Sequence, residues 1–268
     1  MSQIARIGTV SYLNAMPLTL PLEKGVIHSK YQFEITKAPP ARLANLMKVG
    51  ALDVSLLSVV EPLIERRFRI ISGMSICSNG PCLTVQIFYK GDLSKIKVLG
   101  LNKDSKTSNI LAQVILNEKY GIRPSTVMVS NPDKSTLDQV DAFVSLGDRT
   151  FDLLKSDMQR IDLGEVWKDL TGLPIVFAVW VMAPYYKDRD IIPVLRTARE
   201  MGLQMLDEIV PRISRTRDIP MEVLTRYFHE NIDYILETDE KKGIAKLFEF
   251  GSKIALLPPP RKVEYYLG

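Results

Sequence analysis

The sequence predicts an α/β protein of two lobes, joined by a two-stranded hinge around a central cleft. Apolar segments of strand length alternate with segments of helical period along most of the 268 residues. Two long apolar segments, near 83–89 and 175–182, enclose a separate strand–helix–strand block. A chain that leaves one lobe and returns gives lobes of 1–88 plus 180–268 and of 89–179, with ligands expected in the cleft between them. A single doubly wound sheet fits the same pattern.

The first third of the chain is predicted to alternate between strands and helices. Residues 4–10 have near-alternating apolar character and predict a strand that ends in a loop at 11–17. Pro39-Pro40 suits the first turn of a helix that carries an apolar face and ends at Gly50. The other elements predicted here are strands at 33–36, 52–57, 69–76 and 83–89, and a helix that starts at 61–65.

The remainder continues the pattern and ends in helices. Residues 96–101 predict a strand that leads into the polar segment 102–108. The helix that follows has one apolar stripe and ends at Gly121. The other predicted elements are strands near 126–129, 142–146 and 175–182, a helix at 150–154, and a mostly helical region from about 190 to 250.

Composition excludes several classes of protein. Apolar residues make up 46% and charged residues 25%, which is typical of globular proteins. The net charge is +4 and no block of five like charges occurs, so no nucleic-acid partner is predicted. No uncharged apolar run of membrane length and no signal-peptide pattern occurs either. We therefore expect a cytoplasmic protein without a membrane partner.

Cysteine and histidine are too few to build the usual metal sites. The two cysteines are Cys77 and Cys82, and the two histidines are His28 and His229. Their spacing fits no zinc motif, so we expect reduced thiols, no metal and no cofactor. Gly-rich phosphate loops, nucleophile elbows and paired-carboxylate motifs are also missing from the sequence.

Polar residues follow the predicted strands where ligands bind in open α/β sheets. Ser11, Tyr12 and Asn14 follow the first strand. Asn14 is either a neutral ligand donor or the cap of a helix that begins near Pro17, and its spacing alone favours the cap. Thr84 follows an Asn-Gly-Pro turn and faces either the cleft or the core.

Two further strand ends carry candidates. Ser105, Thr107 and Ser108 precede a predicted helix, whose free N–H groups and dipole favour an anion, although Ser105 also suits a plain N-cap. Gly147 lets the backbone approach a ligand closely. Asp148 either orients a donor or caps the next helix, and a purely structural turn fits these two residues equally well.

Five segments, taken in order between residues 7 and 182, resemble one known family. They are Ser11-Tyr12-Leu13-Asn14-Ala15-Met16-Pro17-Leu18, Gly80-Pro81 with Thr84-Val85, Leu99-Gly100-Leu101 with Asp104–Ser108, Leu146-Gly147-Asp148, and Asp162-Leu163-Gly164 with Trp167, Thr171–Pro174 and Phe177–Trp180. Each motif alone is weakly specific, but together they resemble the chorismate dehydratases of the futalosine route to menaquinone. Thr84 departs from the Ser usual in that family.

The resemblance implies a periplasmic-binding-protein fold of type II, used in the cytoplasm as a carbon–oxygen lyase without cofactor or metal. The implied reaction removes water from the small dicarboxylate chorismate and gives 3-[(1-carboxyvinyl)oxy]benzoate. Asn14 is the implied catalytic residue. The implied substrate-binding residues are Ser11, Tyr12, Ser58, Thr84, Ser105, Thr107, Ser108, Gly147 and Asp148. The base is either the substrate's own enolpyruvyl carboxylate or Asp148.

Three other functions fit the same fold. The related 1,4-dihydroxy-6-naphthoate synthase uses a cleft histidine, and no histidine lies between residues 29 and 228 here. A transporter's solute-binding protein would carry a signal peptide or a lipobox cysteine. A ligand-sensing module would bind chorismate without turnover.

Overall fold

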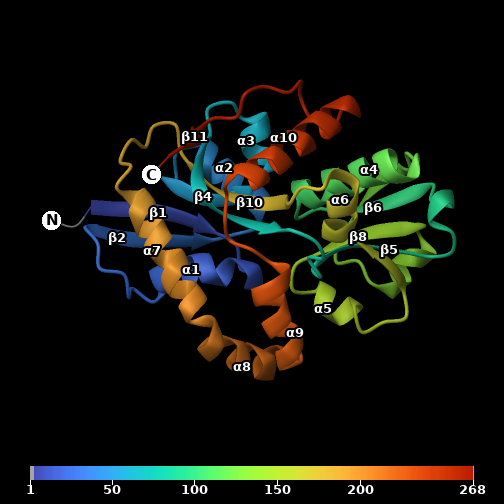
Figure 1. Cartoon of the computed structure of the whole chain (residues 1–268), viewed down its shortest axis with the longest axis horizontal. Helices are drawn as coiled ribbons and strands as arrows, with labels where there is room; N and C mark the ends of the chain where they lie inside the picture. Colours follow the sequence, from blue (N-terminus) through green and yellow to red (C-terminus); the bar gives the residue numbers. More distant parts are fainter. Residues whose placement is uncertain (1–2, 268) are drawn as a thin grey trace. The chain divides into compact units, whose positions relative to one another are not determined.

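The computed structural model describes residues 3–267, which divide into two compact units (Figure 1). Unit 1 holds the described residues up to Cys77, the segment Val176–Thr238 and the residues from Lys262 on. Unit 2 holds Ser78–Ile175 and Asp239–Arg261. The chain passes from unit 1 to unit 2 after Cys77, whereas the sequence predicts this change after residue 88. It returns to unit 1 after Ile175, whereas the sequence predicts the return after residue 179. The last long helix, grouped with the first lobe there, lies in unit 2.

Unit 1 is built on a six-stranded sheet in the order β11-β4-β10-β3-β1-β2. β1 pairs in parallel with both β2 and β3, whereas β10 runs antiparallel to β3. The strands are β1 Gln3–Thr9, β2 Tyr31–Lys37, β3 Val54–Ser58, β4 Arg69–Ser78, β10 Ile175–Met182 and β11 Tyr265–Tyr266. Every residue of β3 is buried, as expected for a central strand covered on both faces.

Helices cover the sheet of unit 1 at close range. The helices are α1 Met16–Glu23, α2 Pro40–Lys48, α3 Val60–Ile64, α7 Ile191–Gln204, α8 Leu206–Arg217 and α9 Met221–Arg226. α2 packs over Gly8 of β1, where a Cβ would lie 3.0 Å from the side chain of Leu43. α1 and α7 lie side by side, and a Cβ on Gly202 would overlap the carbonyl oxygen of Pro17.

Unit 2 is built on a five-stranded sheet in the order β7-β6-β8-β5-β9. β6 is parallel to β7 and β8, and β5 is antiparallel to β8 and β9. The elements are β5 Val85–Tyr89, β6 Val98–Asn102, α4 Lys106–Tyr120, β7 Ser125–Val129, β8 Ala142–Leu146, α5 Thr150–Leu153, β9 Gln159–Asp162, α6 Leu163–Thr171 and α10 Thr238–Lys253.

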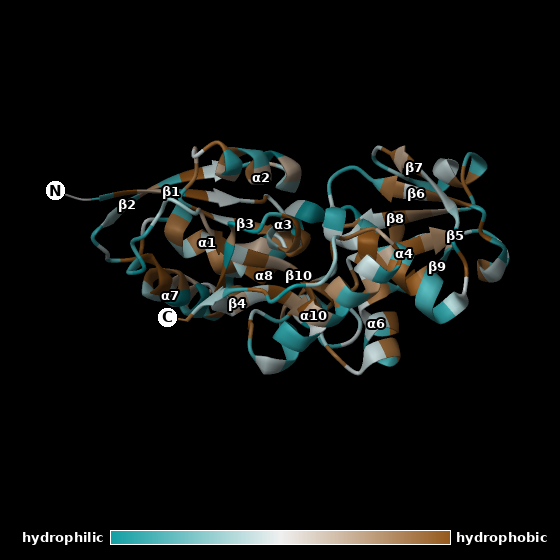
Figure 2. Ribbon diagram, turned by 90° about the horizontal axis from the view of Figure 1, so that it is seen from above, coloured by the Kyte–Doolittle hydropathy of each residue, from teal (hydrophilic) through white to brown (hydrophobic). Residues whose placement is uncertain are grey.

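The core of unit 2 has aromatic residues on one face of its sheet. Phe88 and Phe143 face each other across β5 and β8, with ring centroids 5.5 Å apart. Figure 2 shows both apolar and hydrophilic residues around α4 and α6, as expected of helices that bury one side. α10 belongs to this unit because the ring of its Phe250 lies edge-on to Trp167, with centroids 6.1 Å apart.

Most predicted elements are confirmed. The helix after Ser105 ends at Gly121 in a left-handed conformation, and the long buried strand spans Ile175–Met182. The strand predicted at 83–89 starts only at Val85, because a tight turn precedes it. The strand Gln159–Asp162 was not predicted from its charged sequence.

Both sheets place their parallel strands in the same arrangement. β1 lies between β2 and β3, and β6 lies between β7 and β8. From β1 the chain moves to β2 on one side and then to β3 on the other side, and it moves from β6 to β7 and β8 in the same way. The direction of winding therefore reverses between β1 and β3, and between β6 and β8. The carboxyl ends of strands at such a switch point are the usual ligand-binding position of open α/β sheets.

We predict that Gly202→Ala destabilises the protein by about 3 kcal/mol, because the new methyl group overlaps the backbone of Pro17. Gly25→Ala is the control: Gly25 has no neighbour within 4 Å but a φ of +64°, so only the left-handed strain applies, about 1 kcal/mol. Guanidinium unfolding measures both. A smaller loss for Gly202→Ala than for the control would contradict the close packing of α1 on α7.

Candidate functional site

The predicted site residues of unit 1 gather at one edge of its sheet. β1 and β3 are parallel with Gly8 opposite Ser55, so the loop after β1 and the end of β3 lie at the same edge. This edge, called edge 1 below, carries Ser11, Tyr12, Asn14 and Ser58. It is the switch point of the unit.

Asn14 does not cap the helix, so the cap that its spacing favoured is wrong. It lies in a 3₁₀ turn, Leu13–Ala15, and α1 has Ala15 at its N-cap without any side-chain hydrogen bond. The side-chain oxygen of Asn14 is buried and has no hydrogen-bond partner among the described residues. A buried acceptor without a partner costs about 1–3 kcal/mol, so this oxygen suits a donor brought by a ligand.

The other residues of edge 1 differ in exposure. Ser11 is exposed and Tyr12 is half-buried, whereas Ser58 is buried at the end of β3. Ser58 lies opposite Ala178 of β10, and the N–H of the next residue, Val59, donates to the carbonyl of Phe177 at 3.1 Å. The backbone around Ser58 is thus fixed by the neighbouring antiparallel strand.

The predicted site residues of unit 2 gather at the corresponding edge of the second sheet. β6 and β8 are parallel, so Ser105–Ser108 and Gly147–Asp148 follow adjacent strand ends. β5 runs the other way with Val85 opposite Leu146, which brings Thr84 to the same place. This edge is called edge 2 below, and it brings together all six candidates of its unit.

Ser105 is the N-cap of α4, as one of the two sequence interpretations held. Its hydroxyl oxygen accepts the N–H of Ser108 at 3.1 Å and donates to the Ser108 hydroxyl at 3.0 Å. Thr107 and Ser108 are buried in the first turn. Asn109 fastens this turn to the strand, because its amide exchanges two hydrogen bonds with the backbone of Asn102 at 3.0 and 2.7 Å.

The backbone of Thr84 is tied to the loop after β8. Its carbonyl accepts the N–H of Gly147 at 2.9 Å and the hydroxyl of Thr150 at 3.3 Å. Gly147 has a φ of +70°, a conformation that favours glycine. Asp148 is half-buried, and the N-cap position of α5 is taken by Arg149, without a side-chain hydrogen bond.

Two carboxylates close to these edges were not among the predicted site residues. Asp162 caps α6 and also binds the backbone of the segment before Thr84. Its position directly before a helix and its place in the resembling motif were the available signals. Glu61 lies in α3, three residues after Ser58. Its side chain is buried, and Lys48 Nζ lies 3.8 Å from its Oε2.

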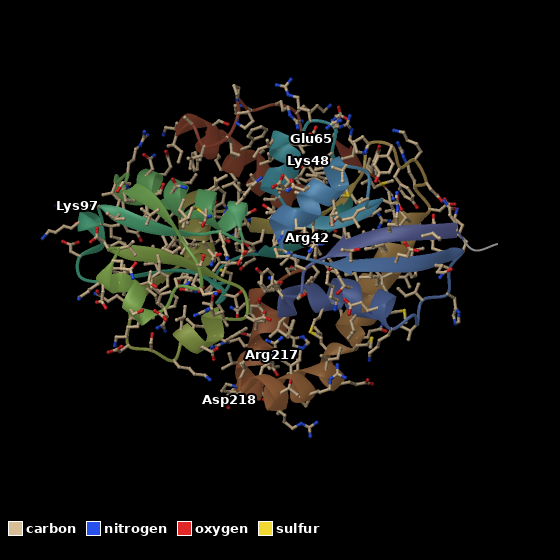
Figure 3. The ribbon with its side chains drawn as sticks, turned by 180° about the vertical axis from the view of Figure 1, so that it is seen from behind. Arg42, Lys48, Glu65, Lys97, Arg217 and Asp218 are labelled. Atoms are coloured by element: carbon tan, nitrogen blue, oxygen red, sulfur yellow. The ribbon has the colours of Figure 1, made fainter. Side chains whose placement is uncertain are left out.

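The charges around α3 are paired with one another. Figure 3 labels Lys48 and Glu65 close together at this part of unit 1. A hydrogen bond from Arg67 holds the pKa of Glu65 below its usual range, and the nearby Lys48 adds to this effect. These residues therefore form structural ion pairs.

Metal ligands and membrane spans were searched within residues 3–267. No cluster of three or more His, Cys, Asp or Glu there could hold a metal ion. No helix in that range has both the length and the apolar character needed to cross a membrane. His28 and His229 are exposed. Apart from Asp148, the candidate residues placed at the two edges offer hydroxyl, amide and backbone groups.

Two mixed α/β sheets with polar residues at their switch points place this protein in the class with a periplasmic-binding-protein-like fold. The structure is similar to that of a protein from Archaeoglobus fulgidus, with a TM-score of 0.77 and 14% identity over 95% of this chain and 98% of the other. It is also similar to the alkanesulfonate-binding protein SsuA from Xanthomonas axonopodis pv. citri, with a TM-score of 0.72 and 14% identity over the full length of both.

Within this class the chain belongs to the menaquinone biosynthesis family, whose model matches residues 5–253. Two curated relatives are similar over most of their length, and both are chorismate dehydratases. One, from Campylobacter jejuni, is 24% identical over 89% of this chain and 94% of its own. The other, from Thermus thermophilus, is 25% identical over 91% of this chain and 93% of its own.

We predict that neither cysteine reacts with a thiol reagent in the native protein at pH 8. Cys77 and Cys82 are free and buried, and burial, together with the charge of Asp162, raises the pKa of the Cys82 thiol. The reactive thiolate is therefore scarce below that pKa. Absorbance after addition of Ellman's reagent should rise only in guanidinium, where both thiols react. A fast reaction of either thiol without denaturant would contradict this burial.

Proposed function

We propose that this protein is a chorismate dehydratase that forms 3-[(1-carboxyvinyl)oxy]benzoate on the futalosine route to menaquinone. The observation that carries the proposal is the similarity of this chain, over 89% and 91% of its length, to two chorismate dehydratases. Membership of the menaquinone biosynthesis family supports it. The buried, unpartnered side-chain oxygen of Asn14 marks edge 1 as a position that a ligand would complete. A hydroxyl group both donates and accepts hydrogen bonds, so a primary amide is a matching partner for the hydroxyl that leaves.

The proposed reaction is an elimination across two ring carbons. A base takes the C3 proton, and the electron pair of the C3–H bond forms the double bond between C3 and C4 while the C4–O bond breaks. The base then returns the proton to the departing hydroxyl, which leaves as water. The ring becomes aromatic, so the reaction is strongly downhill and needs no redox partner. The base is one of two groups. It is either the carboxylate of the enolpyruvyl group that C3 carries, with that group held in its reactive rotamer, or the carboxylate of Asp148.

The side chains are assigned separate tasks. Asn14 binds the departing hydroxyl with both ends of its amide: the nitrogen donates to the hydroxyl oxygen and stabilises the negative charge that develops there, while the buried oxygen accepts the hydroxyl hydrogen. Thr84, Thr107, Ser108 and Gly147 hold substrate carboxylate with neutral donors, with help from the N-terminus of α4. Ser11, Tyr12 and Ser58 bind the substrate at edge 1, and Ser105 keeps the first turn of α4 in place through its cap.

The function is tested by incubating the purified protein with chorismate. The proposal expects chorismate to disappear and an aromatic product, lighter by one water, to accumulate in mass spectra. Binding of chorismate without turnover would instead identify a ligand-sensing module. Turnover abolished by removal of a bound metal would overturn the cofactor-independent mechanism.

We predict that Asn14→Ala lowers kcat by about 10²–10³, the usual effect of removing one preorganised donor. Because Asn14 caps no helix and its oxygen is unpartnered, the melting temperature should stay the same or rise. Asn45→Ala, at an exposed asparagine of α2, is the control and should change neither quantity. A destabilised Asn14→Ala protein with normal kcat would assign Asn14 a structural role only.

We predict that Thr107→Val raises KM about tenfold with a smaller effect on kcat, because the buried hydroxyl is assigned to binding a carboxylate in the ground state. Thr126→Val, at an exposed threonine of β7, is the control. Steady-state kinetics with chorismate measure both. An unchanged KM in Thr107→Val would remove Thr107 from the site.

A further inference from the structure

We infer that Asp162 is a positioning residue for substrate binding at edge 2, although it lies outside the set of residues assigned to the substrate. Its carboxylate holds the backbone of residues 82–84 in a strained turn, and this turn sets the place of Thr84 and Gly147. The inference rests on the proposed function for its kinetic part and on geometry alone for its structural part.

Both oxygens of the Asp162 carboxylate are fully engaged. One oxygen, Oδ1, accepts backbone N–H groups at the start of α6, from Gly164 at 2.9 Å and Glu165 at 3.1 Å. The other, Oδ2, accepts the N–H of Leu83 at 2.8 Å and the side-chain amide of Gln86 at 2.6 Å. The N–H of Cys82 lies within reach of both, at 3.0 and 3.2 Å.

The segment that Asp162 holds has an unfavourable backbone conformation. Leu83 has a φ of +58°, and the N–H of Thr84 donates to the carbonyl of Cys82 at 2.6 Å. A three-residue turn with a left-handed centre is a strained γ-turn, rarely adopted by a residue with a side chain. Such strain persists only where surrounding groups over-determine it, and it is concentrated at functional sites.

Asp162 and Gln86 supply that over-determination. The N–H of Leu83 donates to Asp162, and its carbonyl accepts the Gln86 amide at 3.0 Å. Gln86 is itself buried and bonded to Asp162. Both polar groups of the strained residue are thus fixed by side chains, so the turn cannot relax without breaking hydrogen bonds to a charged group.

The turn passes its position on to edge 2. Thr84 is the next residue, and its carbonyl accepts the N–H of Gly147 and the hydroxyl of Thr150. Thr150 in turn shares a hydrogen bond of 2.7 Å with Ser145 at the end of β8. A continuous hydrogen-bonded path therefore leads from Asp162 to the two site residues Thr84 and Gly147.

Close packing fixes the carboxylate against this turn. Gly164 follows Asp162 by two residues, and a Cβ there would overlap the carbonyl oxygen of Gly80 and lie 3.0 Å from Cβ of Cys82. The first turn of α6 therefore sits directly on residues 80–82. This packing holds the carboxylate that caps α6 against the turn.

Asp162→Asn separates the two tasks of this carboxylate. The amide oxygen can still accept the N–H groups that begin α6, which keeps the helix cap. The amide nitrogen then replaces Oδ2 and presents a donor to the donors of Leu83 and Gln86. The turn loses its hydrogen bonds from Leu83 and Gln86 and keeps only one backbone hydrogen bond to this side chain, from the N–H of Cys82 to Oδ1, while the helix keeps its start.

The test compares KM and kcat of Asp162→Asn with those of the native protein on chorismate. We expect KM to rise roughly tenfold, the effect of losing about one hydrogen bond to a charged group, and kcat to fall by a smaller factor. Amide hydrogen exchange should accelerate at Leu83 and Gly147, but not in the first turn of α6. Gln86→Met loosens the turn from the other side and serves if Asp162→Asn does not fold.

Asp141→Asn is the matched control. Asp141 also accepts two backbone N–H groups in unit 2, from Lys97 at 2.8 Å and Val98 at 2.9 Å, but with one oxygen and at the opposite edge of the sheet. Its KM should equal that of the native protein.

An unchanged KM and unchanged exchange in Asp162→Asn would overturn the inference while leaving the proposed function intact. If the native protein does not convert chorismate, the proposed function fails, and the exchange at Leu83 and Gly147 then decides the positioning role by itself. Equal rises of KM in Asp162→Asn and Asp141→Asn would show a general loss of structure and would also overturn the inference.

Discussion

Parallel strand pairing is the constraint on which the arrangement of this protein depends. Because β1 pairs with β3 and β6 pairs with β8, the loops that follow these strands must meet at one edge of each sheet. The two sheets repeat this topology although the sequence shows no repeat. Polar residues far apart in sequence, such as Thr107 and Gly147, are thereby collected at one edge without any sequence motif that joins them.

In the proposed function, both edges bind the substrate through neutral donors. A hydroxyl or backbone N–H binds a carboxylate without placing a second charge out of water, which would be costly without a partner. Asn14 has a buried side-chain oxygen without a hydrogen-bond partner among the described residues. Such a group lowers stability in the free protein and is expected where a ligand completes the hydrogen bonding.

Much of the fold could be predicted from the sequence, because hydrophobic periodicity and turn residues act locally. The cap at Ser105, the stop at Gly121 and the buried strand at 175–182 are of this kind. The contacts of Asp162 with the backbone of Cys82 and Leu83 could not be predicted, because these partners lie some eighty residues away in sequence. The prediction that Asn14 caps α1 is wrong because the chain enters α1 through a 3₁₀ turn, which places the N-cap at Ala15.

The most direct measurement of the account is a titration of the isotopically labelled protein with the aromatic product, followed by amide NMR. The product carries the same two carboxylates as the substrate but cannot react. The account predicts shifts of the backbone amides of Ser58, Thr107 and Gly147, at the switch points of the two sheets. The Asn14 side-chain amide should shift less, because the product lacks the hydroxyl that Asn14 is assigned to bind. Shifts confined to the opposite edges, around Asp53 directly before β3 and Asp141 directly before β8, would contradict it.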